Sequence, residues 1–301
     1  MKVLIAGGSG LIGQALTDFL LEKNIEVVWL VRNRTTYKNV SVFLWNPKNK
    51  TVDASAFDNT DAIINLAGAG IADKPWTAAR KKEITESRTE AAATLFKFLS
   101  EQKHNVKTVI NAAAIGIYGK LNGKYLTEDL IYNGDDFLSE SCIAWESAAH
   151  QFEQLNMRTV ILRIGIVLTT KGGALKEMLM PFKFKTAATF TEGQMQTSWI
   201  HISDLCSIFE FALRNKISGV FNATAPQPVS NKELIAAISK IEKPLLKIAV
   251  PLFILKLMLG ERTEMILQSV HASSAKIESA GFRFQFDNIN QAIENILKHK
   301  L

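Results

Sequence analysis

A cluster of glycines near the N-terminus has the spacing that phosphate binding requires. The segment Gly7–Gly13 (GGSGLIG) follows a short apolar run and precedes a stretch, 11–21, whose apolar residues recur at helical spacing. At such a turn from strand to helix, the backbone can approach a pyrophosphate closely, and the free N–H groups of the helix attract its negative charge. We therefore predict that this segment binds a dinucleotide; a tight turn without a ligand is the simpler alternative.

Two arginines stand where the choice between NAD and NADP is usually made. In dinucleotide-binding folds, an acidic residue about 20 residues after the glycines binds the ribose 2′-hydroxyl of NAD. This chain has Arg32 and Arg34 there, after a second apolar run at 26–31, and no acidic residue between 31 and 34. A guanidinium group offers a planar fork to phosphate oxygens, so the pair favours the 2′-phosphate of NADP over NAD. Ordinary surface charge is the alternative.

Several further segments carry a resemblance to a known superfamily. Together with the glycine segment, NLAG (65–68), AIGIYG (114–119), LRIGIVL (162–168) and WIHISDL (199–205) resemble the extended short-chain dehydrogenases/reductases. More narrowly, the chain resembles an atypical subgroup, the epimerase family proteins, which carry a small C-terminal domain of unknown function. This narrower resemblance rests on ADKPWTAARKKEI (72–84), GDDFLSESCIAWESAA (134–149), NATAPQPVSN (222–231) and the tail at 259–284. It runs from Lys2 to about Lys298.

The resemblance implies an NADP-binding Rossmann domain and a second lobe that forms the pocket for a small-molecule substrate. It assigns the pyrophosphate to Gly7, Ser9, Gly10, Leu11, Ile12 and Gly13, and the path from adenosine to nicotinamide to Asn65, Leu66 and Ala67. Ala113 and Arg163, which belong to later strands, complete the predicted cofactor site.

The resemblance also shows where the usual catalytic groups should stand. Typical members use a Ser or Thr, a Tyr, and a Lys four residues after the Tyr, which lowers the pKa of the phenol. Here Ala113 and Ala114 occupy the hydroxyl position, Cys142 the Tyr position and Glu146 the Lys position. A carboxylate near Cys142 would raise the pKa of the thiol, so we expect Cys142 to be a small packed residue. Glu146 either accepts hydrogen bonds from ribose or substrate hydroxyls or is an exposed helix carboxylate.

Other polar residues remain candidates for proton transfer. Tyr118 follows a predicted strand, which points it towards the cleft, although a packing role is equally compatible. His201 precedes Asp204, which could start or cap a helix, and is either structural or part of the pocket. The candidate catalytic residues are thus Tyr118, Glu146, Cys142 and His201, with ordered water as a further proton donor. Residues that could border a substrate are Trp76, Glu140, Trp145 and Trp199.

Short apolar runs alternate with helical stretches through the first half of the chain, which predicts βαβ units. The fold class is therefore α/β, a Rossmann-type doubly wound parallel sheet with a smaller, partly interleaved C-terminal α/β lobe. After residue 168 glycines and prolines break the alternation. We predict that 1–168 form the NADP-binding domain, to which 199–224 return, and that 169–198 and 225–301 form the substrate-side lobe.

Composition narrows the classes of protein. With 301 residues, 47% of them hydrophobic, the chain can bury a full core and is not disordered. The 35 basic residues are scattered among 29 acidic ones, which argues against binding of nucleic acid. The apolar stretch from Ile248 to Leu259 is too short to cross a membrane. Two cysteines far apart fit the reducing cytoplasm, and no histidines pair as metal ligands. The sequence is compatible with a homodimer but does not determine the oligomeric state.

Two functions follow from these features. The first is an NADP-dependent oxidoreductase or epimerase whose proton donor is not the usual tyrosine. The second is a catalytically degenerate NADP-binding sensor or scaffold, suggested by the loss of the usual proton-transfer residues.

Overall fold

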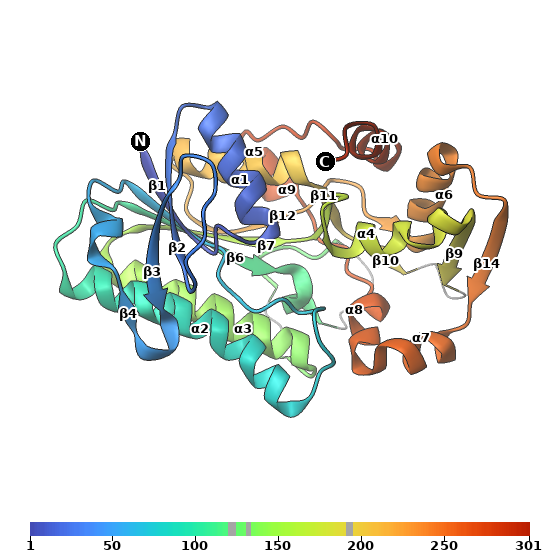
Figure 1. Cartoon of the computed structure of the whole chain (residues 1–301), viewed down its shortest axis with the longest axis horizontal. Helices are drawn as coiled ribbons and strands as arrows, with labels where there is room; N and C mark the ends of the chain where they lie inside the picture. Colours follow the sequence, from blue (N-terminus) through green and yellow to red (C-terminus); the bar gives the residue numbers. More distant parts are fainter. Residues whose placement is uncertain (120–124, 131–133, 191–194) are drawn as a thin grey trace.

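The computed structural model describes residues 1–119, 125–130, 134–190 and 195–301, and its centre is an eight-stranded sheet (Figure 1). The strand order is β12-β7-β6-β5-β1-β2-β3-β4, and every pair is parallel except β3 and β4. The strands are β1 (Lys2–Ala6), β2 (Glu26–Val31), β3 (Ser41–Asn46), β4 (Thr51–Val52), β5 (Ala62–Asn65), β6 (Thr108–Ala114), β7 (Arg158–Ile164) and β12 (Gly219–Ala223).

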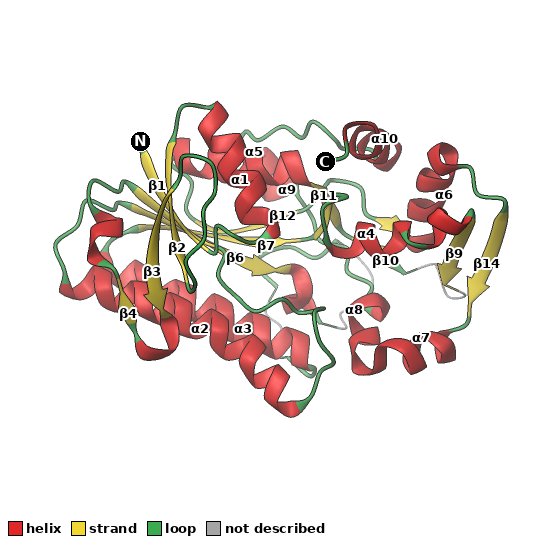
Figure 2. Ribbon diagram, in the orientation of Figure 1, coloured by secondary structure: helices red, strands yellow, loops and turns green. Residues whose placement is uncertain are grey.

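Helices cover both faces of the sheet, as Figure 2 shows. On one face, α1 (Leu11–Glu22) and α5 (Ile202–Arg214) bury an apolar stripe that includes Leu16 and Leu205. On the other, α2 (Ala78–Glu101) and α3 (Phe137–His150) pack a second core with Leu95 and Phe152. The near-continuous burial of the central strands follows from this double cover. The predicted fold class is confirmed.

A smaller lobe with its own apolar core adjoins the sheet domain. The elements that build this lobe or connect it to the sheet domain are β8 (Ile166–Leu168), α4 (Gly173–Leu179), β9 (Thr186–Phe190), β10 (Gln196–Thr197), β11 (Trp199–His201), β13 (Val229–Ser230), α6 (Asn231–Glu242), β14 (Leu246–Val250), α7 (Leu252–Leu259), α8 (Glu264–Leu267), α9 (Ala275–Ser279) and α10 (Ile289–His299). Leu175, Ile238 and Ile293 share this core. Ile277 and Phe282, which fall in the range predicted for the second lobe, instead pack against the core beneath α1 and α5.

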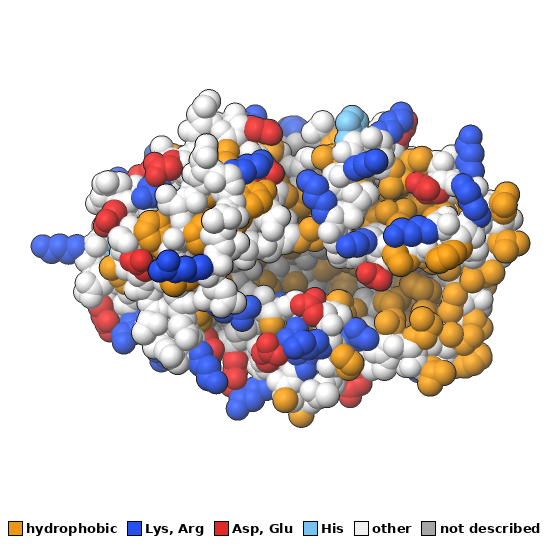
Figure 3. Space-filling model, in the orientation of Figure 1, with side chains coloured by type: hydrophobic (Ala, Val, Ile, Leu, Met, Phe, Trp, Pro, Cys, Tyr) orange, Lys and Arg blue, Asp and Glu red, His pale blue; other side chains and the backbone are white. Residues whose placement is uncertain are grey.

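Figure 3 shows two features of the face it presents: a hollow between the sheet domain and the second lobe, and apolar side chains gathered at the outer edge of that lobe. The most exposed of these on β14 and α7 are Leu246, Phe253, Leu257 and Met258. None of the helices in the described ranges has the length and apolarity needed to cross a membrane.

Candidate functional site

Three of the four glycines after β1 are required by the fold itself. Gly7 has a φ of +86°, and a Cβ there would lie 2.9 Å from the carbonyl carbon of Leu66. A Cβ on Gly8 would lie 2.4 Å from the Trp29 ring, and one on Gly13 would lie 2.5 Å from the carbonyl oxygen of Gly7. These glycines therefore let β1, β5 and α1 approach one another, and Gly13 serves the turn rather than a ligand.

Gly10 differs from the other three glycines because few protein atoms lie where its side chain would be. It is exposed, its φ of −76° suits any residue, and a Cβ there would meet only the Gly7 carbonyl oxygen, at 3.3 Å. Gly10 is also the N-cap of α1, which has neither a side-chain cap nor an acidic residue in its first turn. The first N–H groups of α1 thus remain available to an anion that approaches Gly10.

The remaining residues of the turn are placed so that they can border the same space. Ser9 is exposed, and Leu11 and Ile12 are half-buried. The N–H of Gly7 donates to the carbonyl oxygen of Leu30 over 3.3 Å, which ties the turn to the end of β2. Arg32 and Arg34 follow that end directly, and both are exposed. The structure therefore brings the two arginines to the sheet edge that carries the glycine turn.

The end of β5 is organised differently from the prediction. Asn65 is fully buried: its Nδ2 donates to Asn111 Oδ1 over 2.7 Å, and its Oδ1 accepts from the Ala67 N–H over 3.2 Å. Its side chain therefore joins β5 to β6 and does not line a ligand path. Leu66 and Ala67 are half-buried, with the Leu66 backbone against Gly7.

Ala113 also lies elsewhere than predicted. Its side chain is buried with Ala149 and Ile161, in the layer between β6, β7 and α3. Because successive side chains alternate across a strand, the residue at 113 points under α3 and not towards the sheet edge. The side chain of Ala113 therefore packs within the protein, and its assignment to the cofactor stays a prediction.

The loop after β5 is held from α2. Ser87 Oγ accepts from the Ala69 N–H over 2.9 Å, and Arg80 donates to the carbonyl oxygen of Gly70. Arg88, the residue after Ser87, fills the space beside Gly68, where a Cβ would lie 3.0 Å from its Cγ. The sequence reasoning missed Arg88.

Cys142 is a buried thiol on α3, 7% exposed. Burial raises the pKa of Cys142 to about 12; the Arg88 charge lowers it, and the Glu146 carboxylate raises it further. The predicted direction is thus reproduced, although burial and not the carboxylate is the main cause. A thiol with this pKa stays protonated at neutral pH, which argues against a nucleophilic role.

We expect Cys142→Ala to leave NADP affinity, and any activity that is found, within about threefold of wild type, because only packing is lost. The native thiol should also resist iodoacetamide at pH 8, since little thiolate forms so far below the pKa. Mass spectrometry of labelled native and urea-unfolded protein measures this. Rapid labelling of native Cys142 would contradict the assignment.

Glu146 and Arg163 form a buried, two-pronged ion pair. Arg163 donates from Nε to Glu146 Oε2 over 2.9 Å and from Nη2 to Oε1 over 2.7 Å. The same guanidinium donates from Nη1 to the Tyr118 hydroxyl and to the carbonyl oxygen of Glu128. Glu146 is therefore not the exposed carboxylate that was one prediction, and the guanidinium of Arg163 is engaged with protein groups.

Tyr118 belongs to the same network and does not face a cleft. It is 0% exposed, and its hydroxyl donates to Asn222 Oδ1 over 2.8 Å while it accepts from Arg163. Burial raises the pKa of the phenol, although Arg163 partly opposes this. The hydroxyl thus joins the ends of β6, β7 and β12.

His201 has the structural role that was one of its two predicted alternatives. It is 0% exposed, its Nδ1 accepts from the Ser203 N–H over 3.0 Å as the N-cap of α5, and its ring stacks on Phe286. Burial lowers the pKa of His201 to about 4. Asp204 does not cap the helix; it accepts from the backbone N–H groups of Gln285 and Phe286.

The tryptophans predicted to border a substrate are largely committed to packing. Trp199 is fully buried in the core of the second lobe, and Trp76 is buried against Phe137. Trp145 is 8% exposed, whereas Glu140 is exposed on the first turn of α3.

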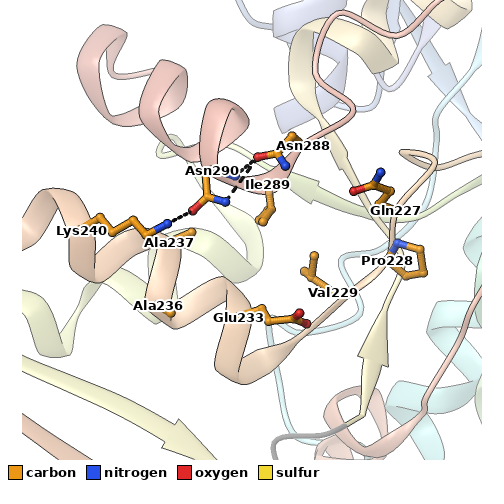
Figure 4. Close-up of a pocket in the computed structure, with 10 residues that line it drawn as sticks. All are labelled: Gln227, Pro228, Val229, Glu233, Ala236, Ala237, Lys240, Asn288, Ile289 and Asn290. Carbon is orange, nitrogen blue, oxygen red and sulfur yellow. Dashed lines mark hydrogen bonds between the residues drawn. The ribbon is translucent and has the colours of Figure 1, made fainter.

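A pocket of about 300 Å³ lies in the second lobe between α6 and the start of α10 (Figure 4). Both of its charged side chains have partners: the Glu233 carboxylate caps α6 at Ser230, and Lys240 donates to Asn290. None of its lining residues belongs to the glycine turn or to α3. In the described part of the chain, no three side chains gather as ligands for a metal.

Two protein-family models match this chain. The model of the NAD dependent epimerase/dehydratase family matches residues 3–223, and that of a domain of unknown function, DUF1731, matches 250–296. The chain is 34% identical to the epimerase family protein YfhF of Bacillus subtilis over 300 residues, covering 99% of this chain and 98% of that one.

Two solved structures extend the comparison. The human epimerase family protein SDR39U1, crystallised with NADPH, superposes with a TM-score of 0.88 at 27% identity and covers 99% of both chains. The UDP-glucuronic acid 4-epimerase of Bacillus cereus, solved with UDP-glucuronic acid and NAD, shares the fold, with a TM-score of 0.79 at 17% identity over 100% of this chain and 99% of that one.

Proposed function

Because this chain belongs to the NAD dependent epimerase/dehydratase family, we propose that it binds NADP(H), with the pyrophosphate on the glycine turn and the 2′-phosphate at Arg32 and Arg34. The observation that carries this proposal is the open space at Gly10, beside the uncapped start of α1. The two exposed arginines favour NADP over NAD, and the similar human protein was crystallised with NADPH.

We further propose an oxidoreductase or epimerase that acts on a small molecule, for which NADP(H) supplies or accepts the hydride. Among the chain's own groups, Cys142 stays protonated and Glu146 is held by Arg163. Tyr118 and His201 are fully buried. A proton donor or acceptor must reach the substrate, so in this proposal ordered water takes the place of the usual Tyr.

The same observations favour a second candidate, an NADP-binding sensor or scaffold. All four residues proposed for proton transfer are buried, and Tyr118, Glu146 and the Nδ1 of His201 form hydrogen bonds within the fold. Incubating the protein with NADPH and a panel of carbonyl compounds and nucleotide sugars separates the two. Turnover of any substrate supports the enzyme, and tight NADPH binding with no turnover supports the sensor.

We expect Arg32→Ala to weaken NADP binding much more than NAD binding, because only NADP carries the 2′-phosphate. A charge-assisted contact of about 1.5–3 kcal/mol corresponds to a loss of roughly ten- to 150-fold for NADP. Calorimetric titration of both cofactors measures this. Arg214→Ala, which removes an exposed arginine paired with Glu210, is the control and should change neither affinity. Equal losses for NADP and NAD would refute the assignment of Arg32.

A further inference from the structure

Arg88 lies on the side of α2 that faces the protein interior, and its guanidinium has no counter-ion among the described residues. Its Nη1 donates to the carbonyl oxygen of Ile84 over 2.8 Å, and it forms no ion pair with any described Asp or Glu. Burial lowers the pKa of the guanidinium, and no carboxylate offsets this. Arg88 is half-buried, and a partly desolvated charge is unfavourable unless something pairs with it.

An unsatisfied donor lies beside Arg88. The Arg88 Cζ is 4.8 Å from the centroid of the Trp145 ring. Trp145 is 92% buried, and its indole N–H has no acceptor within the described ranges. Buried indole N–H groups normally find an acceptor, so α3 presents an unpaired donor next to a guanidinium on α2 that has no counter-ion.

These donors lie at a different place from the glycine turn. The guanidinium lies beside Gly68, three residues past β5, where a Cβ would be 3.1 Å from its Cζ; any side chain there would fill its place. It also influences the pKa of Cys142, which precedes Trp145 by less than one helical turn. The donors thus flank Cys142, the α3 position at which the family resemblance implies the usual catalytic Tyr, and not the start of α1.

We propose that Arg88 and Trp145 form an anion site that binds a carboxylate or phosphate group of the substrate. The guanidinium supplies the charge and up to two parallel N–H donors, and the indole adds a third donor. The inference rests on the proposed function and narrows its substrate class to anionic small molecules. Oxygens of the cofactor are the other source of acceptors, and the test separates the two.

The first measurement follows the Trp145 indole ¹H–¹⁵N resonance, assigned with Trp145→Phe, in protein saturated with NADP. Inorganic phosphate and malonate are titrated at constant ionic strength against sodium chloride. We expect a saturable shift with at least one of the two anions and none with chloride. Arg88→Met, which keeps an apolar stem of similar length, should abolish it. Arg214→Met, which removes an arginine paired with Glu210, should retain it.

The second measurement is calorimetric titration of NADPH. We expect Arg88→Met to bind NADPH within about threefold of wild type, and its ligand-free form to melt no lower than wild type, because it loses an unpaired charge. The anion site is refuted if neither anion gives a saturable shift, or if Arg88→Met retains the shift. A tenfold loss of NADPH affinity would assign the guanidinium to the cofactor instead.

These outcomes differ from failure of the proposed function. If wild-type protein does not bind NADPH, the cofactor proposal fails, and the same anion titrations on ligand-free protein still decide the anion site. If Arg88→Met does not fold, Trp145→Phe carries the test. That variant keeps the aromatic ring but lacks one donor, so the rise in melting temperature produced by the effective anion should be smaller than in wild type. An equal rise would refute the role of the indole.

Discussion

Gly10→Val reduces NADP affinity by on the order of 100-fold or more while the chain stays folded, if the open space at Gly10 holds the pyrophosphate. The fold should tolerate the change, because the φ of −76° suits valine and only one backbone atom lies near the new Cβ. Valine is a poorer N-cap than glycine, at a cost of about 1 kcal/mol. Circular dichroism and calorimetric titration measure the two effects.

Two further variants separate binding from folding at this turn. Gly10→Ala adds only a Cβ, so its loss of affinity should be smaller than that of valine. Gly13→Ala should instead destabilise the protein, because its Cβ would lie 2.5 Å from two backbone oxygens, those of Gly7 and Gly8. Undiminished binding by a folded Gly10→Val would show that the glycine turn does not hold the cofactor.

Glu146→Gln should lower the free energy of unfolding by about 3 kcal/mol, since it leaves the buried Arg163 without its counter-ion. Glutamine keeps the shape of the side chain, so the effect reports lost charge and not a cavity. Urea unfolding measures it. Glu153→Gln, just after the end of α3, is the matched control. Glu153 is exposed, and the loss of its charge should change the free energy of unfolding by less than about 0.5 kcal/mol.

The double variant Glu146→Leu, Arg163→Met tests the same pair. Replacing both partners with apolar residues removes the unpaired charge, so it should cost less than the sum of the two single variants. Unchanged stability of Glu146→Gln together with lost activity would contradict the structural assignment and place the carboxylate in the chemistry.

The sequence predicts best where a function depends on consecutive residues. The glycine spacing and the arginines after the second strand are local patterns, and the structure places both at one edge of the sheet. The alternation of apolar runs with helical stretches likewise predicts the doubly wound sheet, because the burial of each element follows from its own periodicity.

Interactions between distant residues could not be predicted in the same way. Tyr118 and Asn222 are 104 positions apart, and nothing near either shows that they share a hydrogen bond. The side of the sheet that Ala113 faces depends on the register of β6, which the run of alanines at 112–114 does not reveal. For such residues, a resemblance gives the position in the fold but not the direction of the side chain.

Arg88 is the residue whose position in the sequence pattern could have marked it as a candidate. In the helix 78–101, Ile84, Ala91 and Leu95 are fully buried, and Arg88 lies on the same stripe, four residues after Ile84 and three before Ala91. A basic residue on an apolar face has to be paired or functional. A search for polar residues on the apolar stripe of each helix would have identified Arg88.

Calorimetric titration of the wild-type protein with NADPH and with NADH in the same buffer tests whether the glycine turn and the arginines after β2 form an NADP(H) site. We expect one site per chain and an affinity for NADPH at least tenfold higher, since about 1.4 kcal/mol from a single charged contact to the 2′-phosphate is sufficient. Equal affinities, or no binding of either nucleotide, would contradict it.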